Sequence, residues 1–315
     1  MARGDSIQLG SQPVRAMADV GLARLAGGLL AAVLIVLVGF AAYYAYDRYW
    51  VSVESPLDQA TRQLEEAVKQ SPNDPEARMR VAGAYVRQKE YGRAIAQYEE
   101  ALKLRKDWQP ALIAMAFAEL ARGQEGRAAE LYQKVADLNA GNEFRHANRD
   151  LQIVYYRLGT FAAKAGRHSD AAGWARESLA IDRTNADALF LLATSEEVEG
   201  NQSAAADAYR LATAFDPNFR EAFAGLHRIA VARGDSREAA FAHGMETLAG
   251  GDANTALTEF RRLASDSPDY GPAYLGLGLA YGKKGQREEA IGAFRAALDR
   301  DSSLLLAQWS LGSMR

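Results

Sequence analysis

The chain of 315 residues contains no cysteine and has no excess of basic side chains. The first absence excludes disulfide bonds, thiolate metal sites and cysteine nucleophiles. Beyond residue 50 the chain carries 33 Lys and Arg against 37 Asp and Glu, so this part is close to neutral. Because general nucleic-acid binding depends on a basic surface, neither DNA nor RNA is an expected partner.

Residues that could carry catalysis or bind metal are few and scattered. The histidines are His146, His168, His227 and His243, and none has metal-type spacing with another histidine or with a carboxylate on one helix face. The glycines and lysines of residues 276–285 match neither the phosphate-loop nor the dinucleotide motif, and no Gly-x-Ser-x-Gly elbow occurs. We therefore predict that the protein is not an enzyme and has neither a metal nor a cofactor. An enzyme with an unrecognised site is the remaining alternative.

Residues 25–46 form a run without a charged side chain. At about 1.5 Å per residue, a helix of this run spans about 33 Å, enough for the core of a bilayer. Aromatic side chains cluster at its end, as in an interfacial belt: Tyr43, Tyr44, Tyr46, Tyr49 and Trp50. A cleaved signal peptide fits less well, because its apolar core would be shorter and its cleavage site would need small residues. We predict a transmembrane helix at 25–46, a disordered polar segment at 1–24 and a linker at 47–55.

The orientation of this helix rests on a small difference in charge. Arg3, Arg15 and Arg24 precede the span, and Arg48 and Arg62 follow it. The positive-inside rule therefore predicts a cytoplasmic N-terminus, with the rest of the chain in the periplasm or another extracytoplasmic space.

Small residues in the span have the spacing that lets membrane helices pair. The pairs are Gly27 with Ala31 and Gly28 with Ala32. Small residues are also simply tolerated in membrane helices, which is the interpretation we favour, so self-association is a secondary expectation.

Glycines recur at a fixed step through the rest of the chain. Gly166, Gly200 and Gly234 are 34 residues apart, as are Gly251 and Gly285. Alanines follow these or equivalent positions by five residues: Ala94, Ala128, Ala171, Ala205, Ala256 and Ala290. A period of about 34 residues is typical of a helix–turn–helix repeat, and such a unit must stack on its neighbours to bury its apolar face.

The last full unit shows the pattern most completely. It contains Tyr274, Leu277-Gly278 and Tyr281 in its first half, then Gly285, Ala290 and Phe294. This pattern resembles the tetratricopeptide repeat, which implies an all-α, right-handed superhelical solenoid. Gly278 and Ala290 would let the two helices approach closely, and Gly285 would take a positive φ and end the first helix.

Six near-complete copies and two half units follow this pattern. The copies cover residues 75–108, 109–142, 152–185, 186–219, 237–270 and 271–304. Residues 56–70 form a lone second helix, and Leu311-Gly312 belongs to a further first helix.

The spacing breaks in two places. Nine extra residues fall near 142–150, where we predict a longer first helix that begins near Asn142, with Asn142 as its N-cap. Between Gly234 and Gly251 the step is only 17 residues, so three helices occupy 220–266. The segment 236–249 can be the second helix of one unit or the first helix of the next. We predict a kink there, between an N-terminal array (56–236) and a C-terminal array (237–315).

The resemblance also implies a concave groove, lined by first helices, that binds a protein or peptide. The residues it assigns to the groove are Met79, Arg87, Ile113, Phe117, Leu120, Ile153, Tyr156, Arg157, Lys164 and Phe190. Their apolar members form a stripe with basic residues at its edge, which suits a partner with apolar and acidic side chains. Alternatively, these side chains pack across a tight groove or under the 142–150 insertion.

Two further groove positions bear on the kind of partner. Met79 and Gly83 stand where relatives that grip the C-terminal carboxylate of heat-shock chaperones have Lys and Asn, so that role is not expected. The leading hypothesis is a membrane-anchored scaffold for protein partners in envelope assembly or secretion. The alternative is an accessory subunit of a larger integral-membrane complex.

Overall fold

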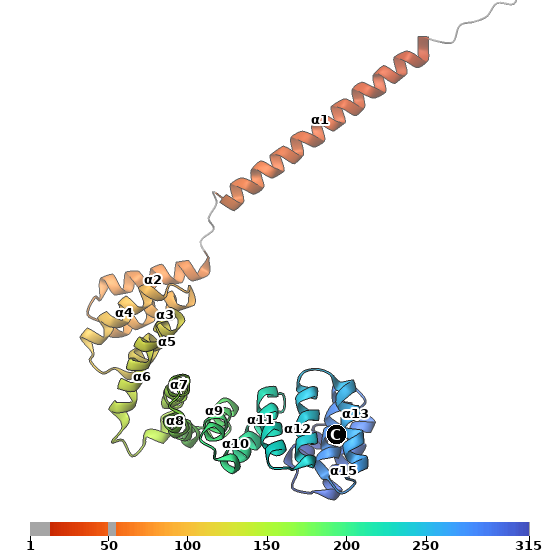
Figure 1. Cartoon of the computed structure of the whole chain (residues 1–315). Coiled ribbons are helices and arrows are strands. Elements are labelled where there is room, and N and C mark those ends of the chain that lie inside the picture. Colours follow the sequence, from red (N-terminus) through yellow and green to blue (C-terminus); the bar gives the residue numbers. More distant parts are fainter. Residues whose placement is uncertain (1–12, 50–54, 315) are drawn as a thin grey trace, which may run out of the picture. The chain divides into compact units, whose positions relative to one another are not determined.

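The computed structural model describes the backbone of residues 13–49 and 55–314, and every regular element in these residues is a helix (Figure 1). The predicted all-α class is therefore confirmed. The chain divides into two compact units, one up to Gln63 and one from Leu64 onward. The first unit contains α1 (Pro13–Tyr49) and the start of α2 (Pro56–Gln70).

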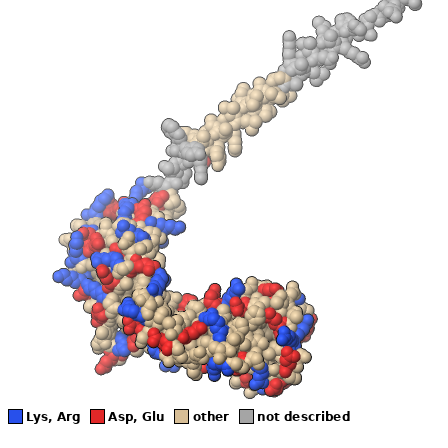
Figure 2. All heavy atoms as spheres, in the orientation of Figure 1, with Lys and Arg blue, Asp and Glu red and all other residues tan. Residues whose placement is uncertain are grey.

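Helix α1 contains the apolar run. Its segment Gly27–Asp47 has 21 residues, a mean hydropathy of 2.3 and no buried residue, so it is long and apolar enough to cross a membrane. Figure 2 shows this part of α1 as a tan stretch nearly free of charged side chains. The helix begins at Pro13, so residues 13–24 are helical, and the prediction of a disordered segment is wrong for them.

Some sequence predictions concern residues outside this description. Residues 1–12, and residues 50–54 of the predicted linker with Trp50, lie outside the described residues. The side chains of Arg15, Arg24 and Arg48, which enter the orientation argument, lie outside them as well.

The second unit is a succession of helices in which each one packs on the next. Its first four pairs coincide with the predicted repeats: α3 (Pro75–Arg87) with α4 (Tyr91–Leu104), α5 (Gln109–Ala121) with α6 (Glu125–Asn139), α7 (Asp150–Lys164) with α8 (His168–Ile181), and α9 (Ala186–Val198) with α10 (Gln202–Phe215). Six helices follow: α11 (Arg220–Ala232), α12 (Ser236–Ala249), α13 (Ala253–Asp266), α14 (Gly271–Lys283), α15 (Arg287–Arg300) and α16 (Leu305–Ser313). Helix α2 has the bounds predicted for the lone second helix.

The repeated small and aromatic residues hold the pairs together. All six recurring alanines are fully buried. Five of them are followed four positions later by a buried aromatic side chain, such as Phe294 with 1 % exposure, and Ala171 is followed by the buried Ala175. A Cβ atom added to Gly278 would lie 2.5 Å from the Phe294 ring, which confirms that glycine allows the close approach of α14 and α15.

The recurring glycines end the first helices in the left-handed conformation. Gly285 has φ 73°, as predicted, and equivalent positive values occur at Gly123, Gly166, Gly200, Gly234 and Gly251. Lys89 takes the same conformation, with φ 61°, in the unit that lacks the glycine. The turn geometry is therefore kept even where the favoured residue is absent.

The insertion near 142–150 is not a longer helix. Helix α6 ends at Asn139 and α7 begins at Asp150, and between them the 3-10 turn η1 (Arg145–Ala147) is the only helical element. The Asn142 side chain accepts a hydrogen bond from the Phe144 amide at 2.9 Å, which closes a local turn instead of capping a helix. Asparagine side chains compete in this way with helical hydrogen bonding, so the prediction was wrong about the role of Asn142.

The Glu177 carboxylate of α8 contacts two side chains of this insertion. Glu177 Oε2 lies 3.1 Å from Arg145 Nε and 2.8 Å from His146 Nε2. Burial favours the neutral acid, but these hydrogen bonds prevail and lower the pKa of Glu177 below its usual value.

Three helices do occupy residues 220–266, as the shortened spacing predicts. Helix α12 packs against both α11 and α13. Gly234 and Gly251 both have positive φ, so α11 and α12 each end like a first helix. In a regular repeat a first helix is followed by a second helix, but here two helices of the first kind, α11 and α12, follow one another. We call this segment, residues 220–249, the phase slip. Residues 64–315 form one compact unit, within which the boundary at 236–237 stays a prediction.

Candidate functional site

Four of the predicted groove residues line one hollow on the first helices. Arg87 of α3, Ile113 and Phe117 of α5, and Ile153 of α7 surround a volume of about 570 Å³. We call it the upstream hollow. Phe117 is 49 % exposed there, so its ring can be contacted from outside the fold.

Two buried tyrosines also line the upstream hollow. The rings of Tyr98 and Tyr132 line it, and both side chains are almost fully buried. Burial raises the pKa of both phenols, although the charges of Arg87 and Arg157 oppose this, so both stay neutral at physiological pH. Arg87 is exposed at the rim, and Asp150 also contributes to the lining. The arrangement can accept an apolar side chain, with a cation available beside it.

The other six predicted residues make contacts within the fold. Met79 packs beside Trp108, and Leu120 packs on the core formed by the first three repeat pairs. Tyr156 packs against the cluster that contains Leu191, and the Arg157 guanidinium lies 5.8 Å from the Tyr156 ring centre.

The last two of these residues are similarly occupied. Lys164 Nζ pairs with Glu125 at 2.6 Å. The Phe190 ring lies 4.8 Å from that of Phe219 and 5.9 Å from that of Tyr209. Four of the ten predicted residues thus meet in the upstream hollow, and the assignment of the other six to a partner-binding groove stays a prediction.

A second hollow, which the sequence did not indicate, lies at the phase slip. It has a volume of about 430 Å³ and is lined by side chains of α10, α11, α12, α14 and α16. Its walls are mostly apolar, with Phe223, Met245 and Leu275 among them. At its polar side Arg210 pairs with Glu238 at 2.6 Å. We call it the downstream hollow.

The Tyr270 phenol also lines the downstream hollow. Its pKa is raised strongly, first by burial and then by the nearby charges of Glu238 and Asp235, so the phenol stays neutral. No sequence motif could have revealed this hollow, because it depends on how the helices pack after the shortened spacing.

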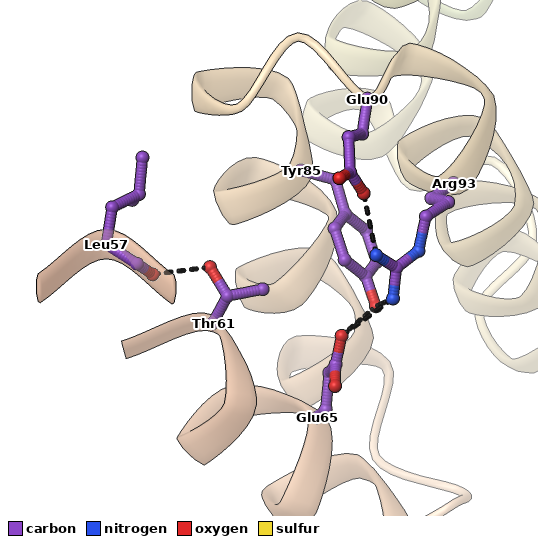
Figure 3. Close-up of polar contacts among 6 residues, drawn as sticks. All are labelled: Leu57, Thr61, Glu65, Tyr85, Glu90 and Arg93. Atoms are coloured by element: carbon purple, nitrogen blue, oxygen red, sulfur yellow. Dashed lines mark hydrogen bonds and ion pairs between the residues drawn. The ribbon is translucent and has the colours of Figure 1, made fainter. Parts of the chain in front are cut away.

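At the start of the second unit, side chains of α2, α3 and α4 form a polar network (Figure 3). Glu65 Oε1 accepts hydrogen bonds from the Tyr85 hydroxyl and from Arg93 Nη2, both at 2.7 Å. Arg93 also bonds Glu90 at 2.7 Å and stacks over the Tyr85 ring at 4.1 Å. Burial and the hydrogen bond to Glu65 raise the pKa of Tyr85 to about 12. This network joins the end of α2 to α3 and α4 and serves the fold.

The histidines at the phase slip lie together, although their spacing in the sequence did not indicate a shared site. His227 of α11 and His243 of α12 have ring centres 5.2 Å apart. The side chain of His243 is 53 % exposed. His243 and Glu246 are three residues apart on α12, so they lie on one helix face, and the prediction that no histidine shares a face with a carboxylate is wrong here.

Comparisons with known proteins agree with the repeat pattern. A family model for the tetratricopeptide repeat matches residues 57–109 and 241–312. The photosystem I assembly protein Ycf3 of Synechococcus sp. (strain CC9311) is 34 % identical over 88 residues, which make up 27 % of this chain and 50 % of that protein. Ycf3 of Synechococcus sp. (strain WH7803) is 33 % identical over 88 residues, with the same shares. The chain thus spans about half the length of the curated relatives it matches.

A solved structure supports the fold. The C-terminal part of a TPR repeat-containing protein from Cytophaga hutchinsonii is 14 % identical and has a TM-score of 0.50, covering 81 % of this chain and 94 % of that one. Together, the repeat spacing, the paired helices and the family match show that this chain contains tetratricopeptide repeats.

Proposed function

We propose that this protein is a membrane-anchored scaffold that holds protein partners through its repeats and performs no catalysis itself. The observation that carries the proposal is that one chain contains both a helix able to span a membrane and an array of repeats. The segment Gly27–Asp47 is apolar and unburied, and an array of protein-binding repeats follows it. A scaffold of this kind would raise the local concentration of its partners at a bilayer.

The partner class follows from the upstream hollow. Phe117 and Ile113 offer apolar contact, and Arg87 offers a cation at the rim. A peptide or helix that inserts an apolar side chain beside an acidic one would match both features. Self-association through the small residues of α1 is a secondary possibility.

The pathway proposed is assembly of membrane or envelope complexes, or secretion. The matched relatives are photosystem I assembly proteins, and this name supports an assembly role for the shared repeats. The sidedness proposed from the arginine distribution is a cytoplasmic N-terminus with the repeats in the periplasm.

The experiment for the groove is site-specific photo-crosslinking in native membranes. A photoreactive residue at Ile113 should capture a partner of defined mass, and Phe117→Ala should remove that product. Phe215→Ala is the matched control, because Phe215 has a similar exposure of 47 % on α10. Equal loss with both variants, or no product at all, would remove the upstream hollow as the partner site.

The anchor is tested separately by protease accessibility from each side of the membrane. The repeats should be digested only from the periplasmic side, and digestion only from the cytoplasm would reverse the orientation. Release of the protein by carbonate washing would show that Gly27–Asp47 does not span the bilayer.

The alternative is an accessory subunit of a larger integral-membrane complex, in which α1 contacts other subunits. The unburied apolar surface of α1 is compatible with this role. Deletion of residues 1–50 separates the two proposals. The remaining repeats of a scaffold still bind the partner, whereas those of a subunit fail to assemble.

A further inference from the structure

The phase slip brings a cluster of nitrogen and carboxylate ligands together. One ligand atom each from His227, His243 and Glu246 lies within 4.8 Å of the other two. From this geometry we infer a binding site for a divalent transition-metal ion, with zinc as the expected occupant. Imidazole and carboxylate are ligands that suit zinc, and three protein ligands leave further positions for water.

The spacing of the three ligands is close to what the ion requires. Zn²⁺ binds nitrogen and oxygen at about 2.0–2.1 Å, so tetrahedral ligand atoms lie about 3.3 Å apart. The ligand atoms here must approach by less than about 2 Å, which a side-chain rotation can supply. His243 has the freedom to rotate, because its side chain is 53 % exposed.

A second carboxylate, that of Glu259, lies next to His243. Glu259 Oε1 of α13 lies 3.4 Å from His243 Nε2. The other oxygen, Oε2, is buried and has no hydrogen-bond partner. Metal-bound histidines usually have a carboxylate that orients the ring, and Glu259 occupies such a position.

The site is accessible, and its surrounding charges are defined. His243 and Glu259 line a hollow of about 460 Å³ between α12 and α13, and the 53 % exposure of the His243 side chain makes its ring accessible from solvent. Arg220 Nε lies 3.7 Å from Glu246 Oε1, and its side chain is 62 % exposed. Arg220 is the cation that a metal ion would displace from Glu246, and its exposure lets it move into solvent.

The consequence of binding would be a cross-link between α11 and α12, the two successive helices that break the repeat order. An ion held by both helices favours the folded arrangement over any state in which they separate. The proposal does not depend on the scaffold function or on the partner of the upstream hollow.

The test is metal binding to the full-length protein in detergent, purified with a tag that contains no histidine and treated with a chelator. Titration with Zn²⁺ alone should show one equivalent bound per chain, with a rise in the unfolding temperature. Co²⁺ should give visible absorption bands typical of nitrogen and oxygen coordination.

Four variants decide the assignment. His227→Gln and His243→Gln should each weaken binding at least about tenfold and abolish the thermal shift. Glu259→Gln, the positioning variant, should weaken binding by about 10- to 100-fold. His168→Gln, a histidine on α8, is the matched control and should leave binding unchanged.

The opposite results are equally clear. Substoichiometric binding, or binding that survives His243→Gln, would overturn the site. Because the His243 side chain is more than half exposed, this variant keeps its fold and the result stays interpretable. An equal loss in His168→Gln would show nonspecific binding and overturn the site as well.

Discussion

The contact between Gly278 and Phe294 gives a sharp test of how the repeats are held together. In Gly278→Ala the new Cβ atom would lie 2.5 Å from two atoms of the Phe294 ring and 2.9 Å from a third. Carbon atoms prefer about 3.5–4.0 Å, so the overlap is about 1 Å. The ring is only 1 % exposed, so it has little room to move aside.

Two opposing effects decide the magnitude. Overpacking of a well-packed core costs about 1–3 kcal/mol, and three close contacts place this site near the upper end. Replacing glycine by alanine inside a helix returns about 1 kcal/mol of helix propensity. We expect a net loss in the free energy of unfolding of about 1–2 kcal/mol for Gly278→Ala.

Gly292 of α15 is the matched control. A Cβ atom added there meets nothing within 4 Å, so Gly292→Ala should stabilise the protein by about 1 kcal/mol. Urea unfolding of the full-length protein in detergent, followed by circular dichroism, compares the two variants. Hydrogen exchange of the α14 amides adds a local measure, because long repeat arrays can lose cooperativity.

A double variant tests the cause. Phe294→Leu shortens the side chain that clashes, so it should cost less in the Gly278→Ala background than in the wild type. The coupling energy should exceed about 0.5 kcal/mol. If Gly278→Ala is as stable as Gly292→Ala, the Phe294 ring is free to shift, and the close approach does not fix the helix pair.

Three further predictions concern polar contacts. Glu65→Ala removes the acceptor of the network in Figure 3. The α2 amides should then exchange about tenfold faster, since a Tyr85 hydroxyl that loses its acceptor in a part-buried site costs about 1–3 kcal/mol. Glu177→Gln should increase hydrogen exchange in residues 142–149, because one carboxylate oxygen holds both side chains of that insertion. Glu197 has a lowered pKa, because hydrogen bonds from Arg228 and Tyr209 outweigh burial. Its stabilising contribution is therefore present above the usual value of 4.5 and is lost as the pH falls through the lowered value.

Each of these predictions has its own control. Glu66→Ala on the same helix removes an exposed pair with Lys69, so α2 exchange should stay as in the wild type. Equal exchange in Glu66→Ala and Glu65→Ala would contradict the role of the network. Unchanged exchange over 142–149 in Glu177→Gln would mean that other contacts hold the insertion. For Glu197, the Gln variant should show a flatter dependence of stability on pH below 4.5, and an identical profile would exclude this carboxylate as the cause.

The sequence predicted the helices well, because each position of the repeat has the same structural role in every unit. The buried alanines, the buried aromatic side chains and the positive-φ glycines recur in the structure at the predicted positions. The number of helices between 220 and 266 also followed from the spacing of Gly234 and Gly251.

The insertion could not be predicted from the spacing, because two local preferences compete there. The absence of proline and internal glycine in 142–150 is compatible with a helix. The side chains of Asn142 and Asn148 instead accept hydrogen bonds from amides two residues ahead and close turns. Asparagine at both ends of a short polar segment was the signal for this outcome.

The binding surfaces were predicted only in part. The repeat pattern assigns residues to the first helices, and four of them do meet in the upstream hollow. It does not determine which of them are covered by neighbours, as Phe190 is by Phe219. The downstream hollow and the histidine cluster both lie at the phase slip, where the regular pairing that guides such assignments is interrupted.

The phase slip also limits how long a single ligand can be. An extended ligand that follows α3, α5, α7 and α9 meets equivalent surfaces one repeat apart. Elsewhere a second helix separates each first helix from the next, but α11 is followed directly by α12. A ligand with regularly spaced anchor residues therefore loses register at this point. We expect one short ligand segment to bind before α11 and α12 and an independent one to bind after them. One chain would then hold two different partners at once.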